Sequence, residues 1–274
     1  MREGIAHAAE ELVRAGGGAS IEWHGARVGT HFQPIFAVRR RACLGFEALA
    51  RVRDVEGRAG SAESLFASVP AGSRGLLDWA CRALHLRNFA TMDPGDRMLF
   101  INVHPEAALA DIRCARELAG LIRYYGLTPR RLCIEILEAA CSDDGALREA
   151  VLAYREIGAC IALDDFGVAC SDLERVRRLR PDIVKLDRSV IGSCAESEGS
   201  RASLRAMVGE LHASGAKVAI EGVETGRQLA WAIESGADYV QGIHLAPPGP
   251  HLLDEAPGTQ AWNRSLGGPE RLAA

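Results

Sequence analysis

Eight short runs of apolar and β-branched residues recur along the chain. From the second run onwards, the segments between them have apolar residues at every third or fourth position, as in residues 199–214, where Leu204, Val208 and Leu211 share one face. We interpret the runs as β-strands and these segments as helices. The predicted strands are residues 28–38, 43–50, 98–103, 132–137, 160–164, 182–186, 217–221 and 238–241.

This alternation of eight strands and six helices predicts an α/β fold, a closed (β/α)8 barrel of the TIM type. The first two strands are joined by the short turn Arg39-Arg40-Arg41 and form a predicted hairpin, so the barrel begins irregularly. A doubly wound open sheet is the alternative fold, but no G-x-G-x-x-G motif follows the first strand.

We expect the barrel domain to occupy residues 21–255. Residues 1–20 are predicted to form an amphipathic helix and a glycine linker, which could contact a partner protein, and residues 256–274 to form an irregular tail. No apolar run approaches the length of a membrane span, and the N-terminus lacks a secretory apolar segment. We therefore expect a cytoplasmic protein with no membrane span.

Composition narrows the possible partners. The 274 residues include 32 Lys+Arg and 36 Asp+Glu, which gives a net charge of −4 and argues against duplex DNA as a partner. The 25% of charged residues and 48% of hydrophobic residues are typical of a globular protein and exclude a disordered chain. The eight cysteines show no C-x-x-C spacing, so we expect reduced core thiols rather than a metal site.

Polar residues stand at the end of nearly every predicted strand. In a (β/α)8 barrel the carboxyl ends of the strands lie on one face, which carries the chemistry. We therefore expect a site at this mouth of the barrel. Its candidate residues are Glu47, Asn102, Glu135, Glu138, Asp164, Asp165, Lys185, Asp187, Glu221 and Gln241.

Carboxylates packed this closely hold protons unless a cation neutralises them, and oxygen ligands without His or Cys suit Mg²⁺ or Mn²⁺. The adjacent Asp164 and Asp165 suggest a bridge between two ions, an arrangement that cleaves phosphate esters. Lys185, one of only two lysines, supplies a compact positive charge. The alternative chemistry is proton abstraction beside a carboxylate by a lysine and Mg²⁺.

Several candidates belong to longer motifs. Phe46-Glu47-Ala48-Leu49-Ala50-Arg51 follows Gln33-Pro34-Ile35 and precedes Asn102. The later motifs are Glu135-Ile136-Leu137-Glu138, Asp164-Asp165-Phe166-Gly167, Lys185-Leu186-Asp187, Glu221-Gly222-Val223-Glu224-Thr225 and Gln241-Gly242. Their order and spacing resemble the EAL-domain cyclic di-GMP phosphodiesterases of bacterial signalling over roughly residues 28–248.

The resemblance implies a modified barrel with one antiparallel strand, which is often dimeric and hydrolyses cyclic di-GMP to the linear dinucleotide with two Mg²⁺ or Mn²⁺ ions. Ca²⁺ is expected to inhibit, because its looser coordination holds water less well. By position, Glu47, Asn102, Glu135 and Asp164 would ligate the first ion, and Asp164 would be shared with the second, which Asp165 completes.

The remaining roles are also implied by the resemblance. Lys185 would hold or activate the water beside Glu221, and with Glu47 these form the expected catalytic set. Arg51 would grip a substrate phosphate. The other expected substrate contacts are Gln33, Asp187 and Gln241, and the expected loop supports are Glu138 and Glu224.

One segment departs from the family pattern. Residues 168–172 read Val-Ala-Cys-Ser-Asp where the family usually has Thr-Gly-Tyr-Ser-Ser, a loop that supports the second metal and the dimer contact. This departure motivates a second hypothesis: a catalytically weak or silent receptor that binds cyclic di-GMP and signals through a protein partner.

Overall fold

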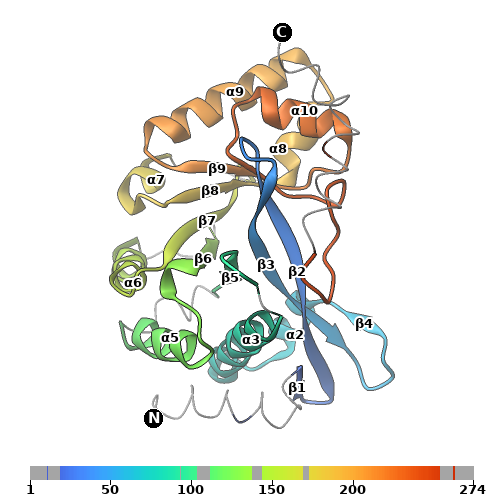
Figure 1. The fold of residues 1–274 in the computed structure, drawn as a ribbon, viewed down its shortest axis with the longest axis vertical. Helices are drawn as coiled ribbons and strands as arrows, with labels where there is room; N and C mark the ends of the chain where they lie inside the picture. Colours follow the sequence, from blue (N-terminus) through green and yellow to red (C-terminus); the bar gives the residue numbers. More distant parts are fainter. Residues whose placement is uncertain are drawn as a thin grey trace.

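Eight strands form a closed barrel in the computed structural model, which describes residues 11, 19–92, 94–103, 112–137, 144–168, 173–253 and 262 (Figure 1). Around the barrel their order is β2-β10-β9-β8-β7-β6-β5-β3, and pairing between β2 and β3 closes it. The strands are β2 (Ala26–Ala37), β3 (Ala42–Arg53), β5 (Met98–Asn102), β6 (Leu132–Leu137), β7 (Cys160–Phe166), β8 (Ile183–Leu186), β9 (Lys217–Ile220) and β10 (Tyr239–Val240). The predicted TIM-like α/β barrel is confirmed.

The barrel contains one antiparallel strand. β2 runs antiparallel to both of its neighbours, β3 and β10, whereas the other neighbouring pairs are parallel. The turn between β2 and β3 includes Arg41, whose φ of 51° lies in the left-handed region. The resulting hairpin register places Gln33 opposite Glu47.

Two short strands extend the sheet beyond the barrel and were not predicted. β1 (Ser20–Trp23) pairs with the start of β2, and β4 (Ala59–Gly60) pairs with the end of β3. β2 and β3 are correspondingly longer than predicted, and Figure 1 shows them projecting past the barrel wall. Their sequences, Ser-Ile-Glu-Trp and Ala-Gly, lack the run of apolar residues that marks the barrel strands.

Helices cover the outside of the barrel. The six predicted helices are present, and two short ones, α2 and α8, are additional. The described helices are α2 (Ala62–Ser68), α3 (Ala71–Thr91), α5 (Ile112–Tyr124), α6 (Asp144–Glu156), α7 (Leu173–Leu179), α8 (Arg188–Ser193), α9 (Glu198–Ala213) and α10 (Gly226–Glu234), with a 3-10 turn at Pro129–Arg131. In the part of the chain that the structure describes, no helix is long and apolar enough to cross a membrane.

The hydrophobic core has two parts. The larger lies between the strands and their helices, and the smaller comprises Ile35, Phe100, Cys133, Ala162, Ile183 and Ala219. Cys133 and Cys160 are paired in register on β6 and β7, and Cys43, Cys81, Cys133, Cys160 and Cys194 are free thiols.

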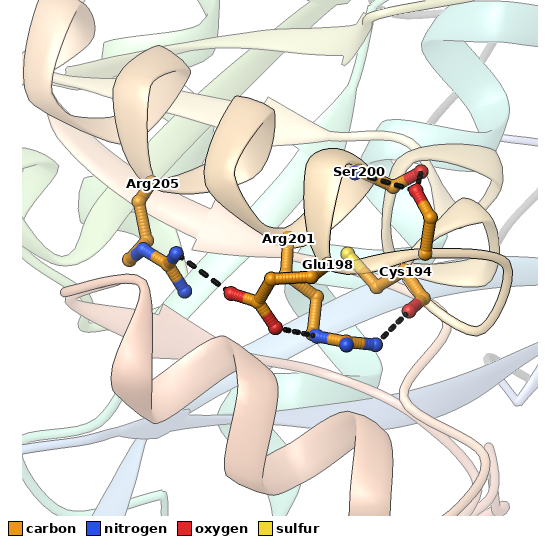
Figure 2. A network of polar contacts seen from close by, with 6 residues as sticks. Cys194, Glu198, Ser200, Arg201 and Arg205 are labelled. Carbon is orange, nitrogen blue, oxygen red and sulfur yellow. Dashed lines mark hydrogen bonds and ion pairs between the residues drawn. The ribbon is translucent and has the colours of Figure 1, made fainter.

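A polar network fixes the connection between α8 and α9 (Figure 2). Arg201 donates through Nη1 to the carbonyl oxygen of Cys194 at 2.9 Å and through Nε to Glu198 at 2.8 Å. Glu198 also accepts from Arg205 Nη2 at 3.0 Å, and the Arg201 guanidinium lies over the Trp231 ring of α10. The network joins three helices on the side of the barrel behind β8 and β9, although its exposed ion pairs add little stability.

Candidate active site

The carboxyl ends of the strands bring the predicted polar residues to one mouth of the barrel. β3 supplies Glu47, β5 ends on Asn102, β6 carries Glu135, β7 carries both aspartates and β8 carries Lys185. Glu221 follows β9 directly, and Gln241 follows β10. Glu138 lies outside the described residues.

Lys185 is the centre of this cluster. Its Nζ atom lies 2.6 Å from Glu135 Oε1, 2.6 Å from Glu221 Oε1, 3.0 Å from Asp164 Oδ1 and 3.5 Å from Glu47 Oε2. The side chain is only 1% exposed, so these carboxylates replace water as the surroundings of the ammonium group. Four carboxyl groups therefore share one positive charge.

Burial and charge shift the pKa values of these groups strongly. Burial alone would lower the pKa of Lys185, but the surrounding carboxylates, Asp164 foremost, hold it well above its usual value. Burial and the neighbouring Glu47 raise the pKa of Glu135 well above its usual range, and burial raises that of Glu221 to about 8 despite the opposing effect of Lys185. Without a further cation, some of these carboxyl groups therefore hold protons at neutral pH.

Two amide side chains orient Glu47. Asn102 Nδ2 donates to Glu47 Oε1 at 3.1 Å, and Gln241 Nε2 donates to Glu47 Oε2 at 2.7 Å. The two carboxylate oxygens are thus held from opposite sides of β3, one from β5 and the other from the residue after β10.

A break in β7 brings two consecutive aspartates into the site. Successive residues of a regular strand point to opposite faces, yet carboxylate oxygens of Asp164, Asp165 and Glu221 lie within 4.8 Å of one another. Asp165 has a φ of 58°, and the β7–β8 register shifts between Leu163 and Phe166. The left-handed residue therefore turns the second carboxylate into the mouth, at a cost of about 1–3 kcal/mol in backbone strain.

The cluster fits divalent metal ions. Glu135 Oε2 and Gln241 Oε1 are buried and have no hydrogen-bond partner among the described residues. Buried carboxylate oxygens are normally paired, so an unpaired one next to further carboxylates is suited to a cation. The donor set is made of oxygen atoms, which Mg²⁺ and Mn²⁺ prefer.

A cavity of about 950 Å³ opens beside the cluster. Arg51, Asn102, Asp164 and Asp165 line its inner side. The opposite wall comes from α2 and α3, and includes Phe66, Arg74, Asp78, Arg82 and His85. Sequence reasoning missed this wall, because helical periodicity assigns such residues to packing and no strand end marks them.

Two further predicted residues, Asp187 and Glu224, are not among the carboxylates that surround Lys185. Asp187 caps α8 by accepting from Ser189 N at 2.8 Å. The Asp187 carboxylate still acts on the site through its charge. The pKa of Asp165 is raised by burial and, in addition, by the negative charges of Asp164 and Asp187. Glu224 has an exposed side chain just before the Thr225 cap of α10.

Comparison with known proteins gives a consistent family assignment. The chain is 30% identical over 255 residues to the cyclic di-GMP phosphodiesterase NbdA of Pseudomonas aeruginosa, which covers 86% of this chain and 32% of NbdA. The first four curated relatives are matched over 30–42% of their own length, so the chain spans less than half of each.

Solved structures share the fold. BlrP1 of Klebsiella pneumoniae in complex with calcium and cyclic di-GMP has a TM-score of 0.74 and 26% identity, over 81% of this chain and 56% of that chain. A standalone EAL protein of Vibrio cholerae bound to cyclic di-GMP has a TM-score of 0.76 and 26% identity, over 85% and 97% respectively. The family model of the EAL domain matches residues 19–248. This chain belongs to the EAL domain family.

Proposed function

We propose that this chain is a two-metal-dependent phosphodiesterase that hydrolyses cyclic di-GMP to the linear dinucleotide pGpG. The observation that carries the proposal is the buried cage of four carboxylates around Lys185, beside a cavity of about 950 Å³. NbdA, a relative over most of this chain, is named as an enzyme of this activity.

The proposed metal ligands are those that the family pattern implies, and they all lie at the mouth of the barrel. Glu47, Asn102, Glu135 and Asp164 would hold one ion, and Asp165 with the shared Asp164 would hold the other. Two bound ions supply positive charge that lowers the pKa of water and stabilises the oxygens around a reacting phosphorus atom. Bound ions would also take the place of the protons that these carboxyl groups hold in the metal-free cage.

Lys185 is proposed to position the attacking water rather than to deprotonate it. Its Nζ atom lies 2.6 Å from both Glu135 Oε1 and Glu221 Oε1, a position from which an ammonium group can donate a hydrogen bond to the water. Glu221, whose Oε1 atom lies 2.6 Å from that Nζ, is the adjacent carboxylate able to accept the proton of the water.

Arg51 is proposed to bind a phosphate of the substrate, since a guanidinium group presents a planar pair of donors to two oxygens. It lies on β3, four residues beyond Glu47, and lines the same cavity as Asp164. Gln33, opposite Glu47 on β2, together with Asp187 and Gln241, is proposed to complete the contacts with the nucleotide.

The test is hydrolysis of cyclic di-GMP by purified protein in Mg²⁺, Mn²⁺ or Ca²⁺, with the products separated by chromatography. We expect conversion to pGpG in Mg²⁺ and Mn²⁺ and little in Ca²⁺. Glu47→Ala should abolish turnover because it removes a metal ligand, whereas Glu234→Ala, on the exposed surface of α10, should retain it.

Two outcomes would contradict the proposal. Full turnover by Glu47→Ala would exclude the proposed role of Glu47 as a metal ligand. Tight binding of cyclic di-GMP without conversion would exclude the enzyme and support the receptor hypothesis. The homodimer remains a prediction, which sedimentation of the purified protein would test.

A further inference from the structure

A second cavity, of about 570 Å³, lies between α6 and α7 and shares no lining residue with the cavity at the barrel mouth. Its walls are dominated by positive charge, and no acidic residue is among its described lining residues. Six arginines line it: Arg148, Arg155, Arg175, Arg177, Arg178 and Arg180.

Three of these six arginines have no charged or hydrogen-bonding partner in the part of the chain that the structure describes. Arg155 is used structurally, since it donates to the carbonyl oxygens of Leu179 and Arg180 at the end of α7, with Asp182 Oδ2 at 3.9 Å. In contrast, the guanidinium groups of Arg148, Arg177 and Arg180 have no ion-pair or hydrogen-bond partner among the described residues. Like charges gathered in one cavity repel, and a bound anion would relieve that repulsion.

The cavity also offers apolar surface. Val151, Leu152 and Leu179 contribute aliphatic side chains, and Leu152 is 47% exposed although leucine is usually buried. The arginine stems add further methylene groups. A matching ligand therefore combines several oxyanions with an apolar group.

We propose that this α6–α7 cavity binds an acidic segment of a partner protein, in which carboxylates pair with the arginines and an apolar side chain packs on Leu152. Guanidinium groups bind carboxylates in a planar, two-pronged geometry. Two other occupants fit less well. No described lining residue is aromatic, so single-stranded nucleic acid would lack its stacking surface. A symmetric contact with a second copy would place arginines against arginines.

The experiment uses the full chain and a fluorescein-labelled peptide made of repeated Glu-Glu-Leu units. Binding is followed by fluorescence anisotropy at low salt. We expect saturable binding that weakens as salt is raised. The double variant Arg148→Glu/Arg177→Glu should weaken binding about tenfold or more through charge reversal. Leu152→Ser should weaken it less, and Arg227→Glu, a single charge reversal on the exposed side of α10, should leave it unchanged.

Competition distinguishes the ligand classes. An excess of an all-Glu peptide should displace the probe only partly, because it lacks the apolar group. Displacement by tripolyphosphate or oligo(dT) at lower concentration than by the Glu-Glu-Leu peptide would overturn the proposal, as would equal binding by the double variant and Arg227→Glu. Cyclic di-GMP turnover by the double variant should equal that of the unmodified chain, which separates this surface from the mouth.

Discussion

At the scale of single residues, the site is defined by four carboxyl groups around the ammonium group of Lys185. The ammonium group is within 3.5 Å of four carboxylates, and removing one partner of a buried charge cluster leaves the others uncompensated. The sequence could identify Lys185 as unusual because lysine is so rare in this chain, but not that four acids surround it.

Lys185→Ala should therefore have two effects. Turnover should fall by about 10²–10³-fold, the usual range for loss of a positioned donor, while binding of Mn²⁺ is largely retained. Without metal, the variant should be less stable than the unmodified chain, since the carboxylates lose their cation. Initial rates, Mn²⁺ calorimetry and denaturation in chelator measure these effects.

The chain contains its own control. Lys217→Ala removes the other lysine, an exposed residue paired with Asp238 at 2.9 Å, and should change neither turnover nor Mn²⁺ binding. An unchanged rate in Lys185→Ala would exclude its proposed role.

At the scale of elements, the predicted strands were confirmed because each contains a run of core-facing residues. The two short strands and the short helices α2 and α8 were not predicted, since their formation depends on neighbouring elements rather than on local periodicity.

The connections that follow the strands also determine where the site residues lie. Gly242 packs so closely on Val223 that an added Cβ would overlap the Val223 backbone.

Gly242→Ala should consequently displace the end of β10 and with it Gln241, whose amide holds Glu47 at 2.7 Å. We expect a loss of roughly 1–3 kcal/mol in unfolding free energy, together with reduced turnover. Gly209→Ala is the matched control, because Gly209 lies within α9 with no atom near the added methyl group. That change should stabilise the chain by about 0.5–1 kcal/mol. Urea denaturation and initial rates measure both; equal stability of the two variants would contradict the packing argument.

At the scale of the whole molecule, α3 is attached to the barrel through a buried polar contact. Asn88 Nδ2 donates to Thr30 Oγ1 at 3.1 Å, and Thr30 Oγ1 lies 2.7 Å from His85 Nδ1. The hydroxyl accepts from Asn88, and the direction of its hydrogen bond with His85 depends on which ring nitrogen carries the proton. Burial lowers the pKa of His85 from 6.5 to about 3, so the folded protein keeps the ring neutral.

This contact predicts a pH-dependent stability. Between pH 6.5 and about 3 the unfolded chain binds a proton at His85 and the folded chain does not, so stability falls as the pH is lowered. The slope from this group is at most about 1.4 kcal/mol per pH unit. His85→Gln, whose amide can still form a hydrogen bond with Thr30, should flatten the decline between pH 7 and pH 5 in urea denaturation. An exposed control, His251→Gln, should not. Parallel curves for all three proteins would rule the linkage out.

The sequence by itself determined the barrel and the identity of the polar residues at its mouth, because strand periodicity and residue type are local properties. Glu47, Asn102, Glu135, Lys185 and Gln241 could be selected in this way, and the structure brings them together.

Only the tertiary structure decided how those residues meet. The left-handed turn at Asp165, the cavity wall from α2 and α3, and the arginine cavity between α6 and α7 each depend on contacts between segments distant in the chain. Such contacts are set by packing between elements, which no local pattern encodes.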